Sequence, residues 1–363
     1  MQIGIIGLPY VGKTTLFNAL TGAEAETGLY SAKRTANIAA VKVPDERLYL
    51  LGEKVFRSGK ITPVTIEYLD FVGIKGGSVR SGELDRTLLA SLRNADGIVH
   101  VVRTFEAESV PHIEGRIDPA RDIEIIDLEL ALADLQVVEN RLSSLAKELR
   151  VKRDSELEHE RDLLERCRRS LESGEALREL ELSPEEEKMI KGFQFLTRKP
   201  MLILLNIGED QMEEAEELLN SIHRFTDRPG RGAIALCAEL EMEISQLEDE
   251  EAEEFLKEMG LEGSALQRMV KASYDLMDLV TFFTGGDKET RAWTAPKGTT
   301  AHRAAGMIHS DMERGFIRAE VINWRDLLDC GSFAKAREEG KLRIEGKGYI
   351  VQDGDVLHIR FNV

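Results

Sequence analysis

The sequence predicts an α/β fold: a doubly wound, mainly parallel sheet that is interrupted by a helical insertion and followed by a small α+β domain. Three observations predict this architecture. Short apolar strands alternate with helices from the first residues onward and resume near residue 200, which is typical of a parallel sheet. A seven-residue leucine repeat fills the interval between them. Short alternating strands occupy the chain beyond residue 278.

Composition excludes several classes of protein. The 363 residues suffice for two or three domains with cores of their own. A net charge of −18 argues against a general nucleic-acid coat, although one local basic surface could still contact RNA. The three cysteines lie far apart without metal-ligand spacing, which fits a reducing cytosol. No apolar run approaches the ~18 residues of a membrane span. We therefore expect a cytoplasmic protein without membrane contact.

A strand, a glycine-rich loop and a helix open the chain. Residues 3–6 form the predicted strand, and residues 7–14 follow the pattern G-x-x-x-x-G-K-T. The glycines allow backbone N–H groups to turn inward around an anion, and the start of the helix adds positive potential. Lys13 is placed to reach the outer phosphates and Thr14 to ligate Mg²⁺. The segment predicts a nucleoside triphosphate site made by Pro9, Tyr10, Val11, Gly12, Lys13, Thr14 and Thr15.

Two further strands, at 38–43 and 64–71, lead to a second phosphate-related motif. The second strand ends in D-x-x-G, from Asp70 to Gly73. In P-loop proteins this Asp holds Mg²⁺, usually through water, and the Gly N–H contacts the γ-phosphate. Position 74 is Ile, where Ras-like GTPases carry a Gln that orients the attacking water. Another group must therefore position the water if the chain hydrolyses its ligand.

Strands at 97–102, 201–205 and 233–236 complete the predicted sheet, because each is apolar almost throughout. The motif Asn-Ile-Gly-Glu at 206–209 stands where a GTPase carries N-K-x-D, whose Asp accepts two donors from guanine. Glu is one methylene longer, so its carboxylate is displaced and base choice should change. The Cys-Ala pair at 237–238 either packs over the base or is an ordinary buried strand end. The candidate base-contacting residues are Asn206, Ile207, Glu209, Cys237 and Ala238.

The alternation of strands and helices stops near residue 122, where leucines begin to recur every seven residues. The first series is Leu128, Leu135, Leu142 and Leu149, with Ala131, Val138 and Leu145 between them, and the second is Leu157, Leu164 and Leu171. Two such helices joined by a short turn predict an antiparallel coiled-coil arm, or else a helical subdomain packed on the sheet. A basic cluster at the predicted tip either meets RNA phosphate or complements a helix C-terminus: Lys147, Arg150, Lys152 and Arg153.

The last part of the chain predicts a small α+β domain with strands around one helix, of the β-grasp kind. The expected elements are a hairpin at 280–284 and 290–294, a helix at 301–310, a strand at 316–321, a short pair at 341–344 and 349–351, and a strand at 356–361. This part is the relatively basic one. We therefore expect a nucleotide domain at 1–122 and 199–277, a helical arm at 123–198 and a β-grasp domain at 278–363.

Taken in order, these motifs resemble the YchF-type Obg-like ATPases, a branch of the Obg group of translation-factor P-loop proteins. The resemblance covers nearly the whole chain, and its most specific matches are RAWT at 291–294 and IHSDMERGFIRAEV at 308–321. It implies that the C-terminal module is a TGS domain, a β-grasp fold associated with RNA and ribosome binding. It also implies a preference for ATP over GTP, carried here by Asn206 and Glu209, and a hydrolytic role for His112. Without the resemblance, a histidine in a loop is more often simply exposed.

Three positions depart from the family pattern. Tyr10 stands where the family typically has Asn, and the glycine-rich run after the D-x-x-G motif has become Ser-Gly-Glu-Leu-Asp-Arg at 81–86. In the first loop, which shows no apolar period and is interpreted as mobile, the Mg²⁺-binding Thr has no clear match. Lys33 falls at its place by spacing, and Thr35 is the nearest candidate. These departures put switching and turnover in doubt more than binding.

The sequence as a whole favours a monomeric, slow, Mg²⁺-dependent ATPase. Lys13 and the backbone of residues 9–14 would hold the phosphates, and Thr14 with Asp70 the metal. In-line attack by water would be assisted by His112 and by the charge of Lys13. The TGS domain and the arm would bind a ribosome or ribosomal RNA. The alternatives are a GTPase or dual-specificity NTPase, and a nucleotide-gated RNA-binding scaffold that barely turns over.

Overall fold

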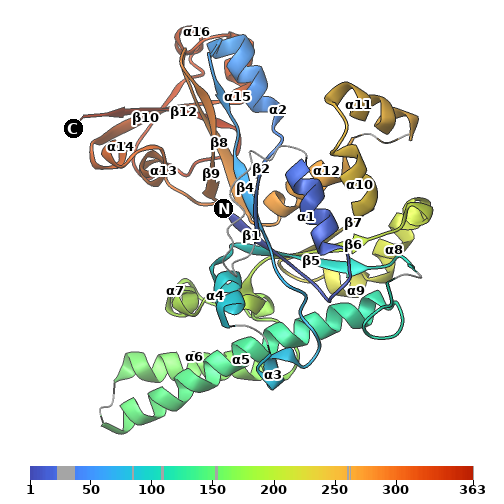
Figure 1. Ribbon diagram of the computed structural model, residues 1–363. Coiled ribbons are helices and arrows are strands. Elements are labelled where there is room, and N and C mark those ends of the chain that lie inside the picture. Colours follow the sequence, from blue (N-terminus) through green and yellow to red (C-terminus); the bar gives the residue numbers. More distant parts are fainter. Residues whose placement is uncertain are drawn as a thin grey trace. The chain divides into compact units, whose positions relative to one another are not determined.

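The computed structural model describes residues 1–22, 37–83, 86–107, 110–151, 154–259, 261 and 263–362. The chain forms two compact units. The first consists of Met1–Val41 and Glu67–Leu276, and the second of Lys42–Ile66 and Met277–Val363. Each unit is built around one six-stranded sheet (Figure 1). In the described part of the chain, no helix is long and apolar enough to cross a bilayer.

The sheet of the first unit has the strand order β2-β4-β1-β5-β6-β7. Its strands are β2 (Asn37–Lys42), β4 (Thr65–Asp70), β1 (Gln2–Ile6), β5 (Gly97–Arg103), β6 (Met201–Asn206) and β7 (Arg231–Leu236). Pairing is parallel from β4 through β1, β5 and β6 to β7. Helices α1 and α10 lie on one side of this sheet and α4 and α5 on the other (Figure 1). The predicted doubly wound, mainly parallel sheet is confirmed, and the carboxyl ends of the parallel strands share one edge.

The helices of the first unit connect these strands and extend beyond them. They are α1 (Lys13–Gly22), α3 (Ser78–Ser81), α4 (Arg86–Asn94), α5 (Pro119–Val151), α6 (Ser155–Glu172), α7 (Pro184–Ile190), α8 (Ala215–Ser221), α9 (His223–Thr226), α10 (Ala238–Ile244), α11 (Asp249–Glu258) and α12 (Ala265–Asp275), with 3₁₀ turns η2 (Leu177–Glu179), η3 (Lys191–Phe193), η4 (Leu196–Arg198) and η5 (Glu209–Glu214). The acidic run at 248–254 lies largely in α11.

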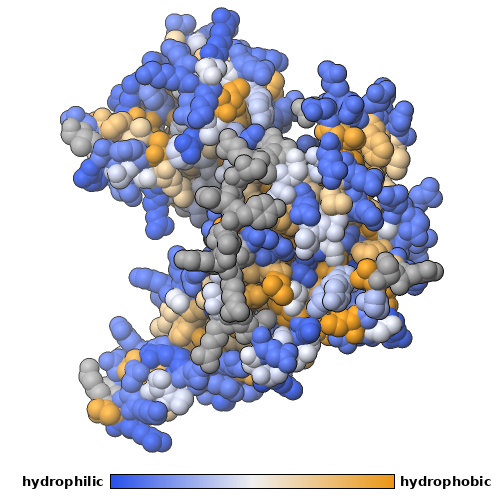
Figure 2. Space-filling model, in the orientation of Figure 1, coloured by the Kyte–Doolittle hydropathy of each residue, from blue (hydrophilic) through white to orange (hydrophobic). Residues whose placement is uncertain are grey.

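Helices α5 and α6 form the predicted antiparallel pair (Figure 1). Val138 and Leu145 of α5 are fully buried against Leu164 and Cys167 of α6. The seam does not begin where the repeat begins, because Leu128 is 53% exposed. The first turns of α5 instead bury Ile123, Ile126 and Leu130, next to the sheet. Figure 2 shows that the surface of the pair is mainly hydrophilic. Of the predicted tip cluster, Lys147 and Arg150 are exposed, and Lys152 and Arg153 lie outside the described residues.

The sheet of the second unit is mixed and has the order β11-β10-β12-β8-β9-β3. Its strands are β11 (Arg343–Glu345), β10 (Phe316–Asn323), β12 (Asp355–Phe361), β8 (Leu279–Gly285), β9 (Thr290–Pro296) and β3 (Ile61–Thr62). The β8–β9 hairpin forms as predicted, and β12 runs parallel to β8. Helix α13 (Ala301–Ile308) contributes Ala301, Ala304 and Ala305 to the main core of this unit.

The sequence led us to expect residues 42–66 in the nucleotide domain. In the structure they belong to the second unit instead. This segment forms α2 (Glu46–Leu50), a π-helical turn η1 (Leu51–Phe56) and β3, which pairs with β9. Leu48 and Leu51 are fully buried in a core that also contains Phe283. The segment therefore completes the second sheet rather than the first, because its apolar residues find their partners there.

The C-terminal part differs from expectation in two further ways. The expected pairing of 341–344 with 349–351 is wrong, because β11 pairs with β10 and Ile350 bridges to Thr300 instead. More than one helix accompanies the strands: α14 (Ser310–Arg314), α15 (Trp324–Cys330) and α16 (Phe333–Glu338) join α13. Each of these three added helices is seven residues or shorter, which is too short for a clear helical period in the sequence.

Candidate functional site

The loop between β1 and α1 requires glycine at two positions. A Cβ on Gly7 would lie 2.4 Å from the carbonyl oxygen of Val101, and one on Gly12 would lie 2.1 Å from Nδ2 of Asn206. Gly12 also has a φ of 90°, in the left-handed region that side chains disfavour. The loop is therefore held tightly between β5 and the residue that ends β6, with the start of α1 directly beyond it.

Lys13 is buried at the first position of α1. Its side chain folds back over the loop, where Nζ donates hydrogen bonds to the carbonyl oxygens of Leu8 (2.6 Å) and Gly7 (3.3 Å). Burial lowers the pKa of Lys13 to about 8, and attraction to Asp70 opposes part of this shift. The first turn of α1 thus holds a cation inside the loop, while the neighbouring Thr14 is exposed.

Asp70 ends β4, the strand next to β1. Its Oδ1 is buried and has no hydrogen-bond partner among the described residues. Burial raises the pKa of the Asp70 carboxyl, and the nearby Lys13 ammonium lowers it in part. A buried carboxylate oxygen without a hydrogen-bond partner is costly unless a further ligand satisfies it. Asp70 therefore has the character expected of a ligand-binding group.

The D-x-x-G turn lies directly against the phosphate loop. A Cβ on Gly73 would be 2.7 Å from the nitrogen of Pro9, and the N–H of Ile74 donates to the carbonyl oxygen of Gly7 at 3.0 Å. The side chain of Ile74 is fully buried in the core. The position that carries a water-orienting Gln in Ras-like proteins is therefore committed to packing here.

Asn206 connects two loops through its side-chain amide. Its Nδ2 donates to the carbonyl oxygen of Val11 at 3.0 Å, and its Oδ1 accepts from the N–H of Ala238 at 3.0 Å. The residue is 4% exposed. Asn206 is thus a structural link between the phosphate loop and the start of α10, and the second N–H of its Nδ2 is not used by either bond, so the base contact stays a prediction. Ile207, also predicted as a contact, is buried in the core.

Glu209 and the Cys237–Ala238 pair remain at the entrance to this edge of the sheet. Glu209 begins η5, is exposed, and makes no hydrogen bond or ion pair with a described residue. Cys237 is 7% exposed and caps α10. Burial raises the pKa of the Cys237 thiol, and the nearby Glu209 carboxylate raises it further. Asn206 of β6 is paired with Leu236 of β7, so Glu209 and Cys237 both lie just beyond the same ends of two adjacent strands, as a shared base site would require.

His112 is held against α5. Its side chain is 4% exposed, and Nε2 lies 2.8 Å from Oδ2 of Asp122. Nδ1 accepts a hydrogen bond from the N–H of Glu114 at 3.1 Å, which places the proton of a neutral ring on Nε2. Asp122 also accepts from Arg121 at 2.7 Å. The interpretation of His112 as a freely exposed loop residue is therefore wrong, and the ring would have to leave Asp122 to reach a water molecule elsewhere.

Three residues that stabilise these loops were missed from the sequence. Thr104 donates from Oγ1 to the carbonyl oxygen of Asn206, and Gln211 accepts from the N–H of Gly208, each at 3.0 Å. Glu129 of α5 is buried and accepts from the N–H groups of Gly77 (2.6 Å) and Val79 (2.8 Å). No motif marks Thr104 or Glu129, because their partners are distant in the sequence, and Gln211 is joined to the distant Thr104 as well as to Gly208. The metal candidate Thr35 lies outside the described residues.

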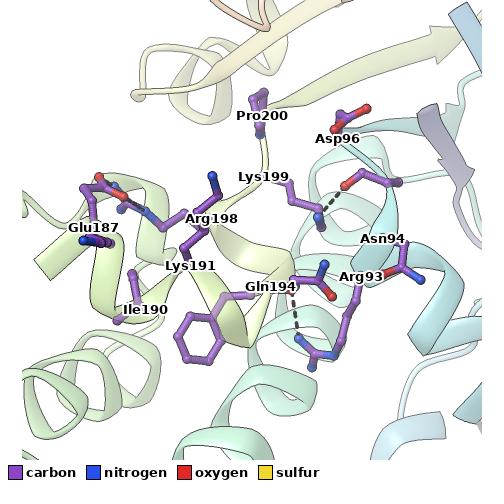
Figure 3. A pocket seen from close by; sticks show the side chains of 13 residues that line it. Arg93, Asn94, Asp96, Glu187, Ile190, Lys191, Gln194, Arg198, Lys199 and Pro200 are labelled. Atoms are coloured by element: carbon purple, nitrogen blue, oxygen red, sulfur yellow. Dashed lines mark hydrogen bonds and ion pairs between the residues drawn. The ribbon is translucent and has the colours of Figure 1, made fainter. Parts of the chain in front are cut away.

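A hollow of about 580 Å³ in the same unit lies away from this site (Figure 3). Its walls come from the end of α4 and from the segment 187–200, next to the amino ends of β5 and β6. Arg93 donates to Asp134 and to the carbonyl oxygen of Gln194, and Lys199 donates to the carbonyl oxygen of Ala95. The phosphate loop follows a carboxyl end instead, so this hollow is not the triphosphate site.

Comparison with known proteins identifies close relatives. Residues 2–141 match a family model described as "50S ribosome-binding GTPase", and residues 279–362 match a model of the YchF GTPase C-terminal region, described as "Protein of unknown function (DUF933)". The chain is 43% identical over 366 residues to "Ribosome-binding ATPase YchF" of Bacillus subtilis, covering 100% of both chains. It is 42% identical to the protein of that name from Escherichia coli O157:H7, covering 100% of this chain and 99% of the other. The solved YchF GTPase of Schizosaccharomyces pombe superimposes with a TM-score of 0.84 at 29% identity, covering 99% of this chain and 97% of the other.

Proposed function

The chain belongs to the YchF family of Obg-like P-loop NTPases, and we propose that it is a ribosome-binding ATPase that hydrolyses ATP slowly with Mg²⁺. The observation that carries the proposal is the arrangement at the carboxyl edge of the first sheet. A tight glycine loop, a buried lysine and an unpartnered buried carboxylate converge there. P-loop proteins bind nucleoside triphosphates with these three features together.

The residues present fit a magnesium ion. Mg²⁺ prefers oxygen ligands and is usually bound by one or two carboxylates together with substrate phosphates and water. Asp70 offers a buried oxygen without a protein partner, and Thr14 offers an exposed hydroxyl at the start of α1. When bound, the ion would neutralise charge on the phosphate oxygens. Lys13 would turn from the carbonyl oxygens of its own loop towards the outer phosphates.

Base choice is assigned to Glu209 with Cys237 and Ala238. Asn206 links Val11 to Ala238 and would shape the base site, with the second N–H of its Nδ2 left to contact the base. Glu209 is the one acidic side chain of the N-x-x-E motif, and its carboxylate is free. A longer acid than the Asp of N-K-x-D would no longer meet both donors of guanine, so ATP is favoured over GTP.

Hydrolysis is expected to be slow, because no side chain at the two positions considered for orienting the attacking water is free to do so. Ile74 is buried and apolar, and His112 is paired with Asp122. This pairing also favours the second candidate function, a nucleotide-gated scaffold with little turnover. A His112→Ala variant with unchanged single-turnover hydrolysis would remove His112 from the mechanism. An Asp122→Asn variant, which weakens the hold on the ring, should change the rate only if His112 takes part.

The ribosome is the proposed partner, through the second unit and the arm. Residues 42–66 and 277–363 together carry 18 Lys and Arg against 16 Asp and Glu, a net of +2 in a chain of net −18. The second unit is therefore the part of the chain that repels RNA least. By the resemblance to the YchF-type family, the C-terminal part of this unit is a TGS domain, a fold associated with RNA and ribosome binding.

Calorimetric titration with ATP and with GTP in the presence of Mg²⁺ tests the proposal. We expect micromolar ATP binding with GTP weaker by about tenfold, or ~1.4 kcal/mol, and a Glu209→Asp variant should narrow this gap. Equal or tighter binding of GTP would overturn the base assignment. Single-turnover hydrolysis then decides between the candidates: tight binding without phosphate release over hours would replace the ATPase by the scaffold.

A further inference from the structure

The second unit contains a hollow of about 500 Å³ that no step of the proposed ATPase uses. This volume is in the range typical of small-molecule sites, about 300–1,000 Å³. Its lining draws on the two most specific sequence runs, with Arg291 and Trp293 from RAWT and Ile308, His309, Asp311 and Met312 from IHSDM, and on the end of β12. The residues that carry the argument are Arg291, Trp293, Ile308, His309, Met312 and Phe361.

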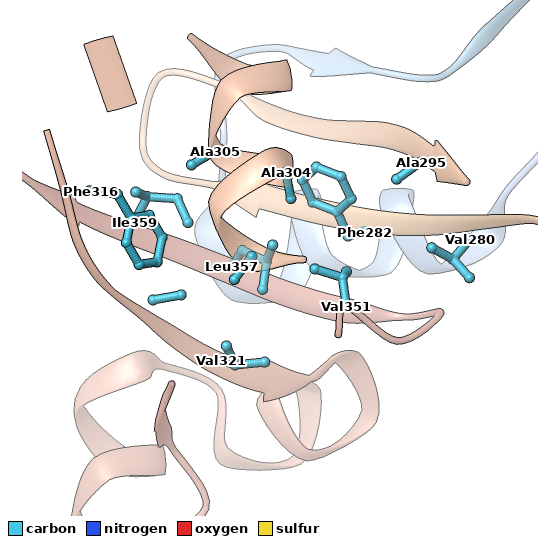
Figure 4. Close-up of a cluster of buried hydrophobic side chains, with 12 residues drawn as sticks. Val280, Phe282, Ala295, Ala304, Ala305, Phe316, Val321, Val351, Leu357 and Ile359 are labelled. Atoms are coloured by element: carbon cyan, nitrogen blue, oxygen red, sulfur yellow. The ribbon is translucent and has the colours of Figure 1, made fainter. Parts of the chain in front are cut away.

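The hollow lies on the face of the second sheet that α13 packs against, at the end that α13 does not cover. In the β8–β9 hairpin, Phe282 faces Trp293, and Thr284 faces Arg291 one row further along. Figure 4 shows Phe282 in the core beside Ala304 of α13. Helix α13 ends at Ile308, which lines the hollow. Thr284 and Arg291 thus lie on the same face of the sheet as Phe282 and Trp293, but beyond the end of α13.

Arg291 lies over the ring of Trp293 in this hollow, with its Cζ 4.2 Å from the ring centroid. The Trp293 ring is nearly parallel to that of Phe282, at an interplanar angle of 12° and a centroid distance of 6.4 Å. Trp293 is fixed further by its Nε1, which donates to Oγ1 of Thr284 at 2.9 Å. Arg291 itself is exposed and forms no ion pair with a described residue. The aromatic pair therefore holds an exposed, positively charged guanidinium over the Trp293 ring.

The acidic residues of the hollow do not cancel this charge. Asp311 pairs with Arg314 and lies 3.6 Å from Nδ1 of His309. Glu289 accepts from Thr62 and lies 3.8 Å from Nζ of Lys60. Each carboxylate has its own cation nearby, so the guanidinium of Arg291 remains available to a ligand.

We propose that this hollow binds an unpaired base of single-stranded RNA, a proposal that rests on the proposed ribosome binding. A base would stack on the exposed face of Arg291, as bases do on guanidinium planes and aromatic rings. Ile308, Met312 and the 41% exposed Phe361 would contact its apolar faces. The positive charge of Arg291 would also favour the adjoining phosphate. A flat, cationic and partly apolar site fits a nucleobase better than an acidic peptide, which would need no stacking plane.

The chain contains two tryptophans, Trp293 and Trp324, which allows a direct test. A full-length Trp324→Phe variant leaves Trp293 as the reporter next to Arg291. Titration with a ten-nucleotide single-stranded adenylate RNA should quench its fluorescence in a saturable way. In the otherwise native chain, Arg291→Ala and Arg291→Lys should each weaken binding of the labelled RNA by about tenfold, because stacking is worth ~1–3 kcal/mol per base. The lysine variant keeps the charge and removes only the plane.

A matched control exists in the same unit. Arg325 is also exposed, and its Cζ lies 5.3 Å from the Trp324 ring centroid, but it does not line the hollow. Arg325→Ala should leave RNA affinity unchanged. Double-stranded RNA that binds as tightly as the single strand, or an Arg291→Lys variant that binds normally, would overturn the proposal, since charge alone would then explain binding.

Co-sedimentation of the same variants with ribosomes separates this proposal from the proposed function. If the native chain sediments with ribosomes and Arg291→Ala does so equally well, the base site is wrong while ribosome binding stands. If Arg291→Ala loses the ribosome and the native chain ignores the oligonucleotide, the occupant is a protein, and the RNA proposal falls. If the native chain binds the oligonucleotide through Arg291 without sedimenting, the base site stands and ribosome binding fails.

Discussion

Tyr10 in the phosphate loop has a φ of 65° and is 67% exposed. This left-handed conformation costs an ordinary side chain about 1–2 kcal/mol, whereas Asn adopts it routinely. We therefore expect Tyr10→Asn, which restores the family's typical residue, to raise the free energy of unfolding by about 1 kcal/mol in denaturant titration. Tyr49→Asn is the control, because Tyr49 is exposed within α2. An equal gain in both variants would contradict the backbone explanation.

Burial of Lys13 should lower the stability of the fold in a pH-dependent way, although its charge is needed to bind phosphates. Its pKa falls from 10.5 to about 8 on folding, so between these values the unfolded chain holds a proton that the folded chain has lost. Stability from this group must therefore rise with pH across that window, and below pH 8 the fold carries the full cost of the buried ammonium. Lys13→Met should stabilise the nucleotide-free chain by about 1–2 kcal/mol at pH 7, with a gain that fades towards pH 10.

The same substitution should abolish ATP binding, since the cation that meets the phosphates is gone. Denaturant unfolding at pH 7 and pH 10 gives the stability differences, and calorimetry gives the affinity. Lys60→Met replaces a lysine whose side chain is 70% exposed and should show neither effect. A Lys13→Met variant that is less stable at pH 7 would mean that its bonds to Gly7 and Leu8 outweigh the cost of burial.

At the residue scale, the sequence predicts site residues that belong to one short motif, but it does not predict contacts between residues that are distant in the sequence. Lys13, Asp70 and the two loop glycines were predictable because their motifs are short and local. The two hydrogen bonds of Asn206 were not, because its partners lie 195 and 32 residues away. The residue type alone indicated a base contact and gave no sign that each end of the amide also holds a second loop.

At the scale of elements, α5 does more than form an arm. Its buried Glu129 accepts hydrogen bonds from the backbone of Gly77 and Val79, just beyond the D-x-x-G turn. The helix that continues into the arm is thus bonded to the segment that follows the nucleotide motif. The heptad repeat predicted the helical pair correctly. It could not show where the seam begins, because the period is the same whether a residue faces α6 or the sheet.

Glu129→Gln tests this connection. The amide keeps the shape of the side chain but replaces one acceptor by a donor that faces N–H groups, which should cost about 1–3 kcal/mol locally. We expect faster hydrogen exchange in residues 75–83, with little change in the strands of the sheet. Glu139→Gln, at an exposed position of the same helix, should exchange like the native chain. Unchanged exchange in both variants would show that the segment is held by other contacts.

At the scale of the whole molecule, the two units are not consecutive pieces of chain. The chain leaves the first sheet after β2, contributes α2, η1 and β3 to the second unit, and returns as β4 with Asp70 at its end. No sequence signal indicated this exchange, because the partners of Leu48 and Leu51 lie beyond residue 280. The predicted boundary at residue 278 is close to Met277, where the chain enters the second unit again. A change in the strand pattern of the sequence marks this point.

This topology predicts that the first unit cannot simply be cut free. A chain ending at residue 276 would expose Leu48 and Leu51, which are fully buried in the core shared with Phe283. Losing the burial of two leucines costs about 3–6 kcal/mol, so we expect this fragment to aggregate or to be cleaved rapidly within residues 44–63. The N–H of Val43 donates to the carbonyl oxygen of Val64 at 2.8 Å, so the two ends of the excursion are adjacent. Replacing residues 44–63 of the fragment by a short Gly-Ser turn should therefore restore solubility and leave β2 and β4 paired. A 1–276 fragment that is as soluble and protease-resistant as the full chain would contradict the argument, because its excursion would then have to be stable without the second core.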